Sequence, residues 1–138
     1  MRRWLRYVVV TSLSLCMAFA AATPAQAMSR EGTWRGTTSE GYGIRFRVNE
    51  AQRVVLVTFK VDIEGAFCEG AITWTATGIR APIRADNTFV VTGQDGLDRF
   101  RVRGQFVARN RAEGLVTTST ISGCLGSGRA TWVARRVL

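Results

Sequence analysis

The sequence predicts an all-β protein, an antiparallel up-and-down meander of about eight strands that closes into a barrel or packs as a compact two-sheet sandwich. Two observations support this fold class. Apolar and polar residues alternate with a period of two through most of the chain after residue 27, which is typical of strands with one buried face. Glycine, asparagine and aspartate recur between the alternating runs, at the spacing that short hairpin turns require.

Residues 1–27 have the pattern of a secretory signal peptide and are not expected to form part of the fold. Arginines near the start precede the largely apolar run 7–22, and Ala25-Gln26-Ala27 provides a small-x-small cleavage site. Cleavage there would leave residues 28–138 as a single secreted β domain, extracellular or periplasmic, with no membrane span. Three of the 19 basic residues leave with the segment and all ten acidic residues remain, so the net charge falls from +9 to +6.

The first half of this domain is predicted to contain four strands separated by turns. In the second of them, Ile44, Phe46 and Val48 alternate with arginines. The third alternates valine and phenylalanine with mostly polar residues, and the fourth alternates threonines with Ile72 and Trp74. Turns containing glycine or asparagine separate several of these runs. The four strands are expected at 33–38, 42–49, 53–62 and 68–77.

The second half is predicted to contain four more strands. The longest of them alternates phenylalanine, valine and glycine with arginines, and Asp95-Gly96 forms the turn before it. Gly126-Ser127-Gly128 precedes the last strand. The connection 78–86 differs from the other turns because it contains apolar residues and a proline, and it could hold a short edge strand. The four strands are expected at 87–93, 97–108, 113–121 and 129–136.

Cleavage of the signal peptide leaves two cysteines, Cys68 and Cys124. An even pair in an exported chain predicts one disulfide. Closing the long loop between them would stabilise the fold by roughly 4 kcal/mol in the chain-entropy description. Two free thiols or half of a metal site would be the alternative, but the chain has neither a histidine nor a second cysteine pair to complete a site. No metal and no cofactor are therefore expected.

The absence of histidine excludes Ser-His-Asp and Cys-His catalysis as well as histidine-based zinc sites. Glu64 and Glu69 flank Cys68, and Asp95 and Asp98 share one hairpin turn, where turn chemistry already explains an Asp-Gly pair. Serine and threonine are common, but no general base accompanies them. The sequence therefore predicts that the protein is not an enzyme.

Trp34, Trp74 and Trp132 alternate with small or polar neighbours and are predicted to point inward. Aromatic side chains facing an internal cavity are what a small apolar ligand requires, so these three tryptophans are the candidate ligand-binding residues. Filling of the core is the alternative, because the interior of a small barrel is normally occupied by side chains.

Two arginine ladders are the candidate anion-binding residues. Arg45 and Arg47 project from the second predicted strand, and Arg99, Arg101 and Arg103 project from the sixth. Such ladders could bind the phosphate, sulfate or carboxylate groups of an anionic surface polymer, or could simply be a solvated face. Aromatic residues do not interleave with these arginines, which disfavours nucleic acid as the partner. The second and sixth strands of a meander lie far apart, so the ladders need not share a face.

Two segments resemble calycin-type barrels, the group of the lipocalins and avidins. They are Gly32-Thr33-Trp34 on the first strand and Arg135-Arg136 on the last. The resemblance implies that Trp34 plugs one end of a barrel and that Arg135 or Arg136 covers it. The order of glycines, tryptophans and two cysteines from Gly32 to Arg135 also resembles small secreted bacterial β-domains of unassigned function. This second resemblance implies export, one disulfide and an all-β fold, and it implies no activity.

The function that these observations predict is non-catalytic binding by a secreted protein, with a protein partner or a small apolar molecule as the ligand. Binding of an anionic surface polymer through the arginine ladders is one alternative. Inhibition of a secreted enzyme is another, and segment 78–86 is then the only candidate for a protruding inhibitory loop.

Overall fold

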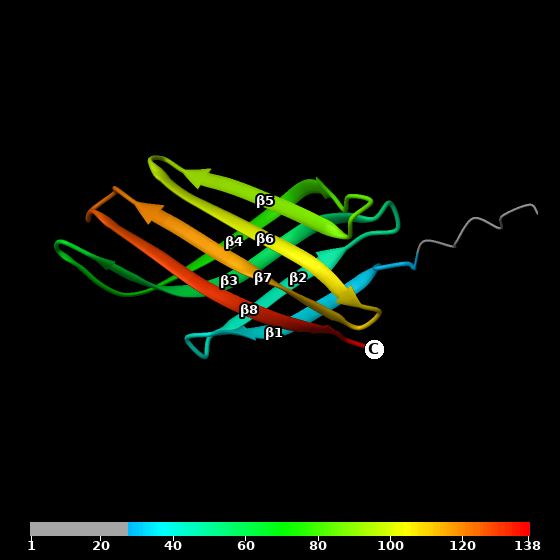
Figure 1. Ribbon diagram of the computed structural model, residues 1–138. Helices are drawn as coiled ribbons and strands as arrows, with labels where there is room; N and C mark the ends of the chain where they lie inside the picture. The colour runs from blue at the N-terminus through cyan, green and yellow to red at the C-terminus, as the bar shows by residue number, and fades with distance from the viewer. Residues whose placement is uncertain (1–27) are drawn as a thin grey trace, which may run out of the picture.

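The computed structural model describes residues 28–138, so the predicted signal peptide lies outside the described residues. Within this range the regular structure consists of eight antiparallel strands and no helix (Figure 1). The strands are β1 (Gly32–Thr38), β2 (Gly43–Val48), β3 (Arg53–Gly65), β4 (Cys68–Pro82), β5 (Thr88–Asp95), β6 (Asp98–Ala108), β7 (Arg111–Thr120) and β8 (Gly126–Arg136). The all-β meander predicted from the alternating pattern is confirmed.

The largest departure from the predicted strand bounds is in β4, which continues to Pro82 and so takes up half of the predicted connection 78–86. Residues 78–80 form a bulge opposite Val55, and Gly78 allows it by adopting a φ of 69°. Proline can end this strand because β4 lies at the edge of the sheet order. The segment therefore belongs largely to the sheet and does not form a protruding loop.

The strands form one sheet in the order β4-β3-β2-β1-β8-β7-β6-β5. Strands adjacent in the chain pair as hairpins, except that β4 and β5 are not paired, and β1 pairs with β8 to join the two halves. At one end Glu64 of β3 also pairs with Ser127 of β8. This pairing closes the sheet into a barrel, with β4 and β5–β7 as extra strands. Of the two architectures that the sequence allowed, the structure is the closed barrel.

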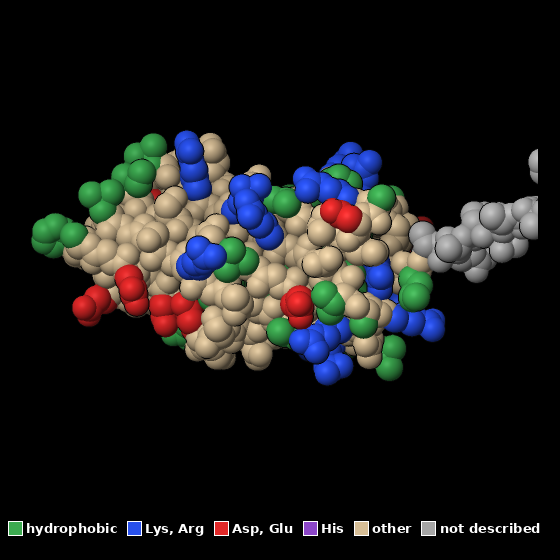
Figure 2. All heavy atoms as spheres, in the orientation of Figure 1, with side chains coloured by type: hydrophobic (Ala, Val, Ile, Leu, Met, Phe, Trp, Pro, Cys, Tyr) green, Lys and Arg blue, Asp and Glu red, His purple; other side chains and the backbone are tan. Residues whose placement is uncertain are grey.

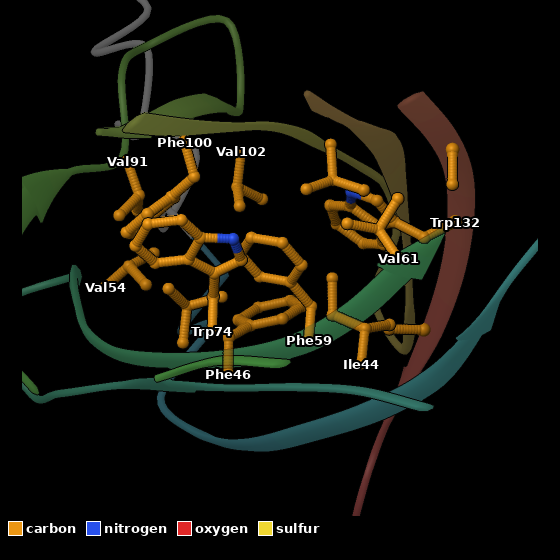
Figure 3. Close-up of a cluster of buried hydrophobic side chains, with 14 of the residues drawn as sticks. Ile44, Phe46, Val54, Phe59, Val61, Trp74, Val91, Phe100, Val102 and Trp132 are labelled. Carbon is orange, nitrogen blue, oxygen red and sulfur yellow. The ribbon is translucent and has the colours of Figure 1, made fainter. Parts of the chain in front are cut away.

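The core lies between the strands β5–β8, which cross in front in Figure 1, and β1–β4 behind them. Trp74 and Phe59 pack against Phe100 with ring centroids 5.1 and 5.4 Å apart (Figure 3). Further along the interior, Trp34 stacks on Phe46 at 5.7 Å. Such offset and edge-to-face contacts stabilise aromatic pairs beyond the area that they bury. The interior is thus filled by large side chains from both halves of the sheet.

Two glycines make room for these rings. Gly93 lies opposite Phe100 and Gly104 lies opposite Phe89 on the paired strands β5 and β6. A Cβ at either glycine would come within 2.4 Å of the facing ring. Each phenylalanine therefore covers the glycine opposite it, a device that keeps a sheet with glycines well packed.

The predicted disulfide between Cys68 and Cys124 is present, with the two Cα atoms 5.4 Å apart. Cys68 is the first residue of β4, and Cys124 lies in the connection between β7 and β8. The bond therefore ties the β3–β4 hairpin to a loop that is distant in the sequence.

Candidate functional site

The three candidate tryptophans are buried in the core. The indole N–H of Trp34 donates to the carbonyl of Arg30 at 3.0 Å. The indole nitrogens of Trp74 and Trp132 are buried without a hydrogen-bond partner among the described residues. All three rings lie against other aromatic side chains, so they act as core residues in this structure. Contact with a small ligand remains a prediction that this packing does not support.

Arg30, a residue that precedes the first predicted strand, lies over the barrel end beside Trp34. Only 8% of Arg30 is exposed, and its guanidinium lies 5.2 Å from the ring centroid of Phe106. The guanidinium also donates to the carbonyl of Ala108 at 2.9 Å. Of the two arginines that the calycin resemblance implied, Arg136 lies opposite Trp34 in the β1–β8 register, whereas Arg135 is exposed on the outer face.

A row of four exposed arginines crosses the outside of the barrel. Arg45 of β2 lies opposite Arg35 of β1. Arg35 in turn lies opposite Arg135 of β8. Arg135 lies opposite Arg111 of β7. Neighbouring strands are about 4.8 Å apart, so this arginine row spans about 14 Å across four adjacent strands.

The arginine row is poor in compensating charge. Within residues 28–138 the only ion pair joins Arg111 to Glu113, at 3.2 Å, and both side chains are half exposed. Arg35, Arg45 and Arg135 have no carboxylate within ion-pair distance in this part of the chain. Like charges that lie directly opposite each other on neighbouring strands repel. The free protein therefore carries a line of cationic charge that a bound anion would stabilise.

The two ladders predicted from the sequence do not merge. Three strands, β1, β8 and β7, separate β2 from β6, which presents Arg99, Arg101 and Arg103 on its exposed face. Arg45 belongs to the arginine row, whereas Arg47 lies opposite Thr33 outside it. Figure 2 shows the basic side chains spread over the middle and right of the face formed by β5–β8.

A groove of about 800 Å³ lies on this outer face, beside the β6 ladder, and is open to solvent. We call it the β6 groove. Its lining combines the apolar side chains of Val90, Leu115 and Val133 with charged side chains, three of them basic (Arg84, Arg101 and Arg103) and two acidic (Asp86 and Glu113). An open surface groove of this kind suits a macromolecular partner better than a small molecule, which needs to be enclosed on most sides.

The two carboxylate pairs noted in the sequence have different surroundings. One oxygen of Asp98 accepts from the backbone N–H groups of Ser122 at 2.9 Å and Ile121 at 2.7 Å, and from the hydroxyl of Thr120. These hydrogen bonds, those from Ser122 and Ile121 above all, lower the pKa of the Asp98 carboxyl. Asp98 thus holds the β7–β8 connection in place. Glu64 and Glu69 lie opposite each other on β3 and β4, and both are exposed.

No family model and no curated protein matches the chain. In the region that the structure covers, no helix is long and apolar enough to cross a membrane. No group of three or more histidine, cysteine, aspartate or glutamate side chains suited to a metal ion occurs among residues 28–138.

Sequence reasoning identified Arg45 but missed the other members of the arginine row as a unit. Arg35, Arg111 and Arg135 come from three strands, and only the β1–β8 pairing brings the first and last strands together. The available signal was local: Arg35 follows Trp34 and Arg135 follows Ala134, so each alternates with a residue that faces inward, whereas Arg111 follows Asn110 in a predicted turn. This signal predicts the side of the sheet for two of the arginines but not the register between strands.

Proposed function

We propose that the protein is a secreted, non-catalytic binding protein that binds a linear polyanion along the arginine row. The observation that supports this proposal is the alignment of four exposed guanidinium groups on adjacent strands, with a single carboxylate paired to one of them. Each opposed pair costs stability in the free protein, and a multivalent anion would replace that repulsion with attraction.

The chemistry of the row favours a polymer over a single ion. A guanidinium presents a planar fork of donors that matches a sulfate, phosphate or carboxylate group in a bidentate manner. One small anion can engage only one or two of these forks. A chain with regularly repeated anionic groups can follow the row for its full length of about 14 Å.

Other ligand classes have less support from the described residues. A small apolar ligand would have to displace buried aromatic side chains such as Trp34 and Trp132. Single-stranded nucleic acid is bound on platforms of exposed aromatic rings. Among the large exposed apolar residues that the structure describes, Phe67 is the one aromatic. It lies on the β3–β4 turn and not beside the row. We therefore favour a sulfated, phosphorylated or carboxylated polymer.

The test uses oxidised protein comprising residues 28–138 and two probes, heparin as a sulfated polymer and polyphosphate as a phosphorylated one. The variant Arg35→Thr/Arg135→Thr removes the centre of the row. Its matched control, Arg99→Thr/Arg101→Thr, removes the same charge from the β6 ladder. Affinity is measured by titration at several salt concentrations, because the slope of log K against log salt counts the ionic contacts.

We expect the row variant to lose most of its affinity for at least one probe, with the slope of the salt dependence reduced by about 2. The ladder control should keep its slope. Equal losses in both variants would show that binding depends on net charge and not on the row. Full retention of affinity in the row variant would overturn the proposal.

A further inference from the structure

Four large apolar side chains are exposed together at the end of the barrel that carries the disulfide. Phe67 is on the β3–β4 turn, Leu97 is on the β5–β6 turn, and Ile121 and Leu125 are on the β7–β8 connection. Each is exposed by half or more, and Phe67 by 99%. The three connections follow odd-numbered strands of a meander, so they lie at the same end (Figure 1). Figure 2 shows apolar side chains projecting there, at the left. We call these four residues the apolar end.

Covalent and hydrogen bonds tie the connections of the apolar end to one another. The Cys68–Cys124 bond ties the β3–β4 hairpin to the β7–β8 connection. Asp98, in the first position of β6, accepts hydrogen bonds from that same connection. A Cβ on Gly65 would lie 2.0 Å from the carbonyl oxygen of Leu125, so the two backbones pack directly against each other. A surface ordered in advance in this way loses little conformational freedom when it binds a partner.

Phe67 contributes nothing visible to the stability of the fold. Its φ of 72° lies in the left-handed region, where a turn normally places glycine or asparagine. Its side chain is almost wholly in water, so burial does not compensate for this backbone strain. Bulky residues in strained and exposed positions are concentrated at contact sites. A role in contact with another molecule accounts for both features.

Negative charge lies directly behind Phe67. Glu64 and Glu69 are exposed, face each other across the β3–β4 hairpin, and have no cationic partner within ion-pair distance among residues 28–138. Figure 2 shows acidic side chains gathered at this end of the molecule. The partner surface should therefore be apolar with cationic side chains around it. An anionic bilayer would repel this end, and so would the same end of a second copy.

The β6 groove offers both kinds of group. Val90, Leu115 and Val133 line it, and its three arginines, Arg84, Arg101 and Arg103, outnumber its two carboxylates, Asp86 and Glu113. In the strand register Leu115 lies directly opposite Arg103, so apolar and cationic groups are neighbours. The chain thus carries both an apolar surface backed by carboxylates and an apolar surface bordered by guanidinium groups.

We propose that the apolar end of one copy docks into the β6 groove of a second copy, with Phe67 against Leu115 and the two glutamates beside Arg101 and Arg103. The contact joins two different surfaces, so each copy keeps one free end and one free groove, and association extends into chains. This self-association goes beyond the proposed binding of a polyanion, because it uses none of the four arginines of the row.

The first experiment measures mass by sedimentation velocity over a concentration series of oxidised protein. We expect the mass to rise with concentration. Phe67→Gly should weaken association at least about tenfold, because it removes a buried aromatic contact. Glycine tolerates the left-handed backbone, so the variant should unfold no earlier than the wild type. The matched control Val107→Ser removes an exposed apolar side chain outside the apolar end and should associate normally.

The second experiment exchanges the charges. The variants Glu64→Arg/Glu69→Arg and Arg101→Glu/Arg103→Glu should each be monomeric alone, because like charges then meet at the contact. A mixture of the two should associate, since the basic end of one fits the acidic groove of the other. Misfolding of either variant could not produce this recovery, because mixing restores only the pairing of opposite charges.

Several results would overturn the proposal. They are a wild type that is monomeric at all concentrations, equal behaviour of Phe67→Gly and Val107→Ser, or a mixture of charge variants that stays monomeric. Binding of phosphatidylcholine vesicles that requires Phe67 would assign the apolar end to a bilayer instead. Heparin affinity of Phe67→Gly should equal that of the wild type, so failure here leaves the polyanion proposal intact.

Discussion

The two ends of the barrel are closed by different means. At one end Arg30 folds over Phe106 and covers the aromatic core with a buried, hydrogen-bonded side chain. At the other end a disulfide and the carboxylate of Asp98 hold three connections together, while Phe67 and its apolar neighbours remain in water. The first arrangement covers the core and hides apolar surface. The second stabilises the loops without covering them, which leaves that surface available for contact.

The largest difference between the ends should appear when the disulfide is removed. Cys68→Ala/Cys124→Ala releases a link between residues separated by 56 positions, and we expect a loss of about 4 kcal/mol in the free energy of unfolding. Urea denaturation of the variant and the wild type measures it. A loss below about 1 kcal/mol would mean that Asp98 and backbone packing hold this end without the disulfide.

Removal of the Arg30 cover should have a smaller effect at the opposite end. Arg30→Met keeps most of the apolar volume but loses the hydrogen bond to Ala108, and we expect a destabilisation of about 2 kcal/mol. Arg53→Met, which alters an exposed arginine, is the matched control and should change stability by no more than about 0.5 kcal/mol. Equal urea midpoints for the two variants would show that Arg30 is dispensable.

Asp98 makes the disulfide end sensitive to acid. Its pKa is lowered in the folded state, so its contribution to stability is present above the unfolded value near 3.8 and is lost as pH falls through the folded pKa. Asp98→Asn should flatten the decline in stability below about pH 4. Thermal unfolding of both proteins across this pH range measures the difference. Parallel curves would show that Asp98 does not couple the loops to pH.

Strand β6 and the disulfide could both be predicted from the sequence. The alternation of Phe100 and Val102 with arginines predicts β6 because a strand repeats every two residues. The pair Cys68 and Cys124 predicts the disulfide because no other cysteine remains in the domain. Both signals lie in the local pattern or in composition, and the structure confirms both.

What the sequence could not predict depends on contacts between distant segments. Arg30 lies outside any alternating run, so nothing in its neighbourhood indicated a buried side chain. Phe67 lies in a turn and carries no periodic signal. Segment 78–86 was predicted to be the protruding loop, but β4 includes half of it. The arginine row needs the pairing of Arg35 with Arg135, which only closure of the barrel brings about.

The arginine row costs the fold some stability, and we propose that binding of a polyanion accounts for this cost. Thermal unfolding of Arg35→Thr/Arg135→Thr, with and without heparin, measures both effects. We expect the free variant to be more stable than the wild type by about 0.5 kcal/mol, because opposed charges are removed. Heparin should raise the melting temperature of the wild type but not of the variant. A variant that is less stable when free, and is stabilised by heparin as much as the wild type, would contradict the claim.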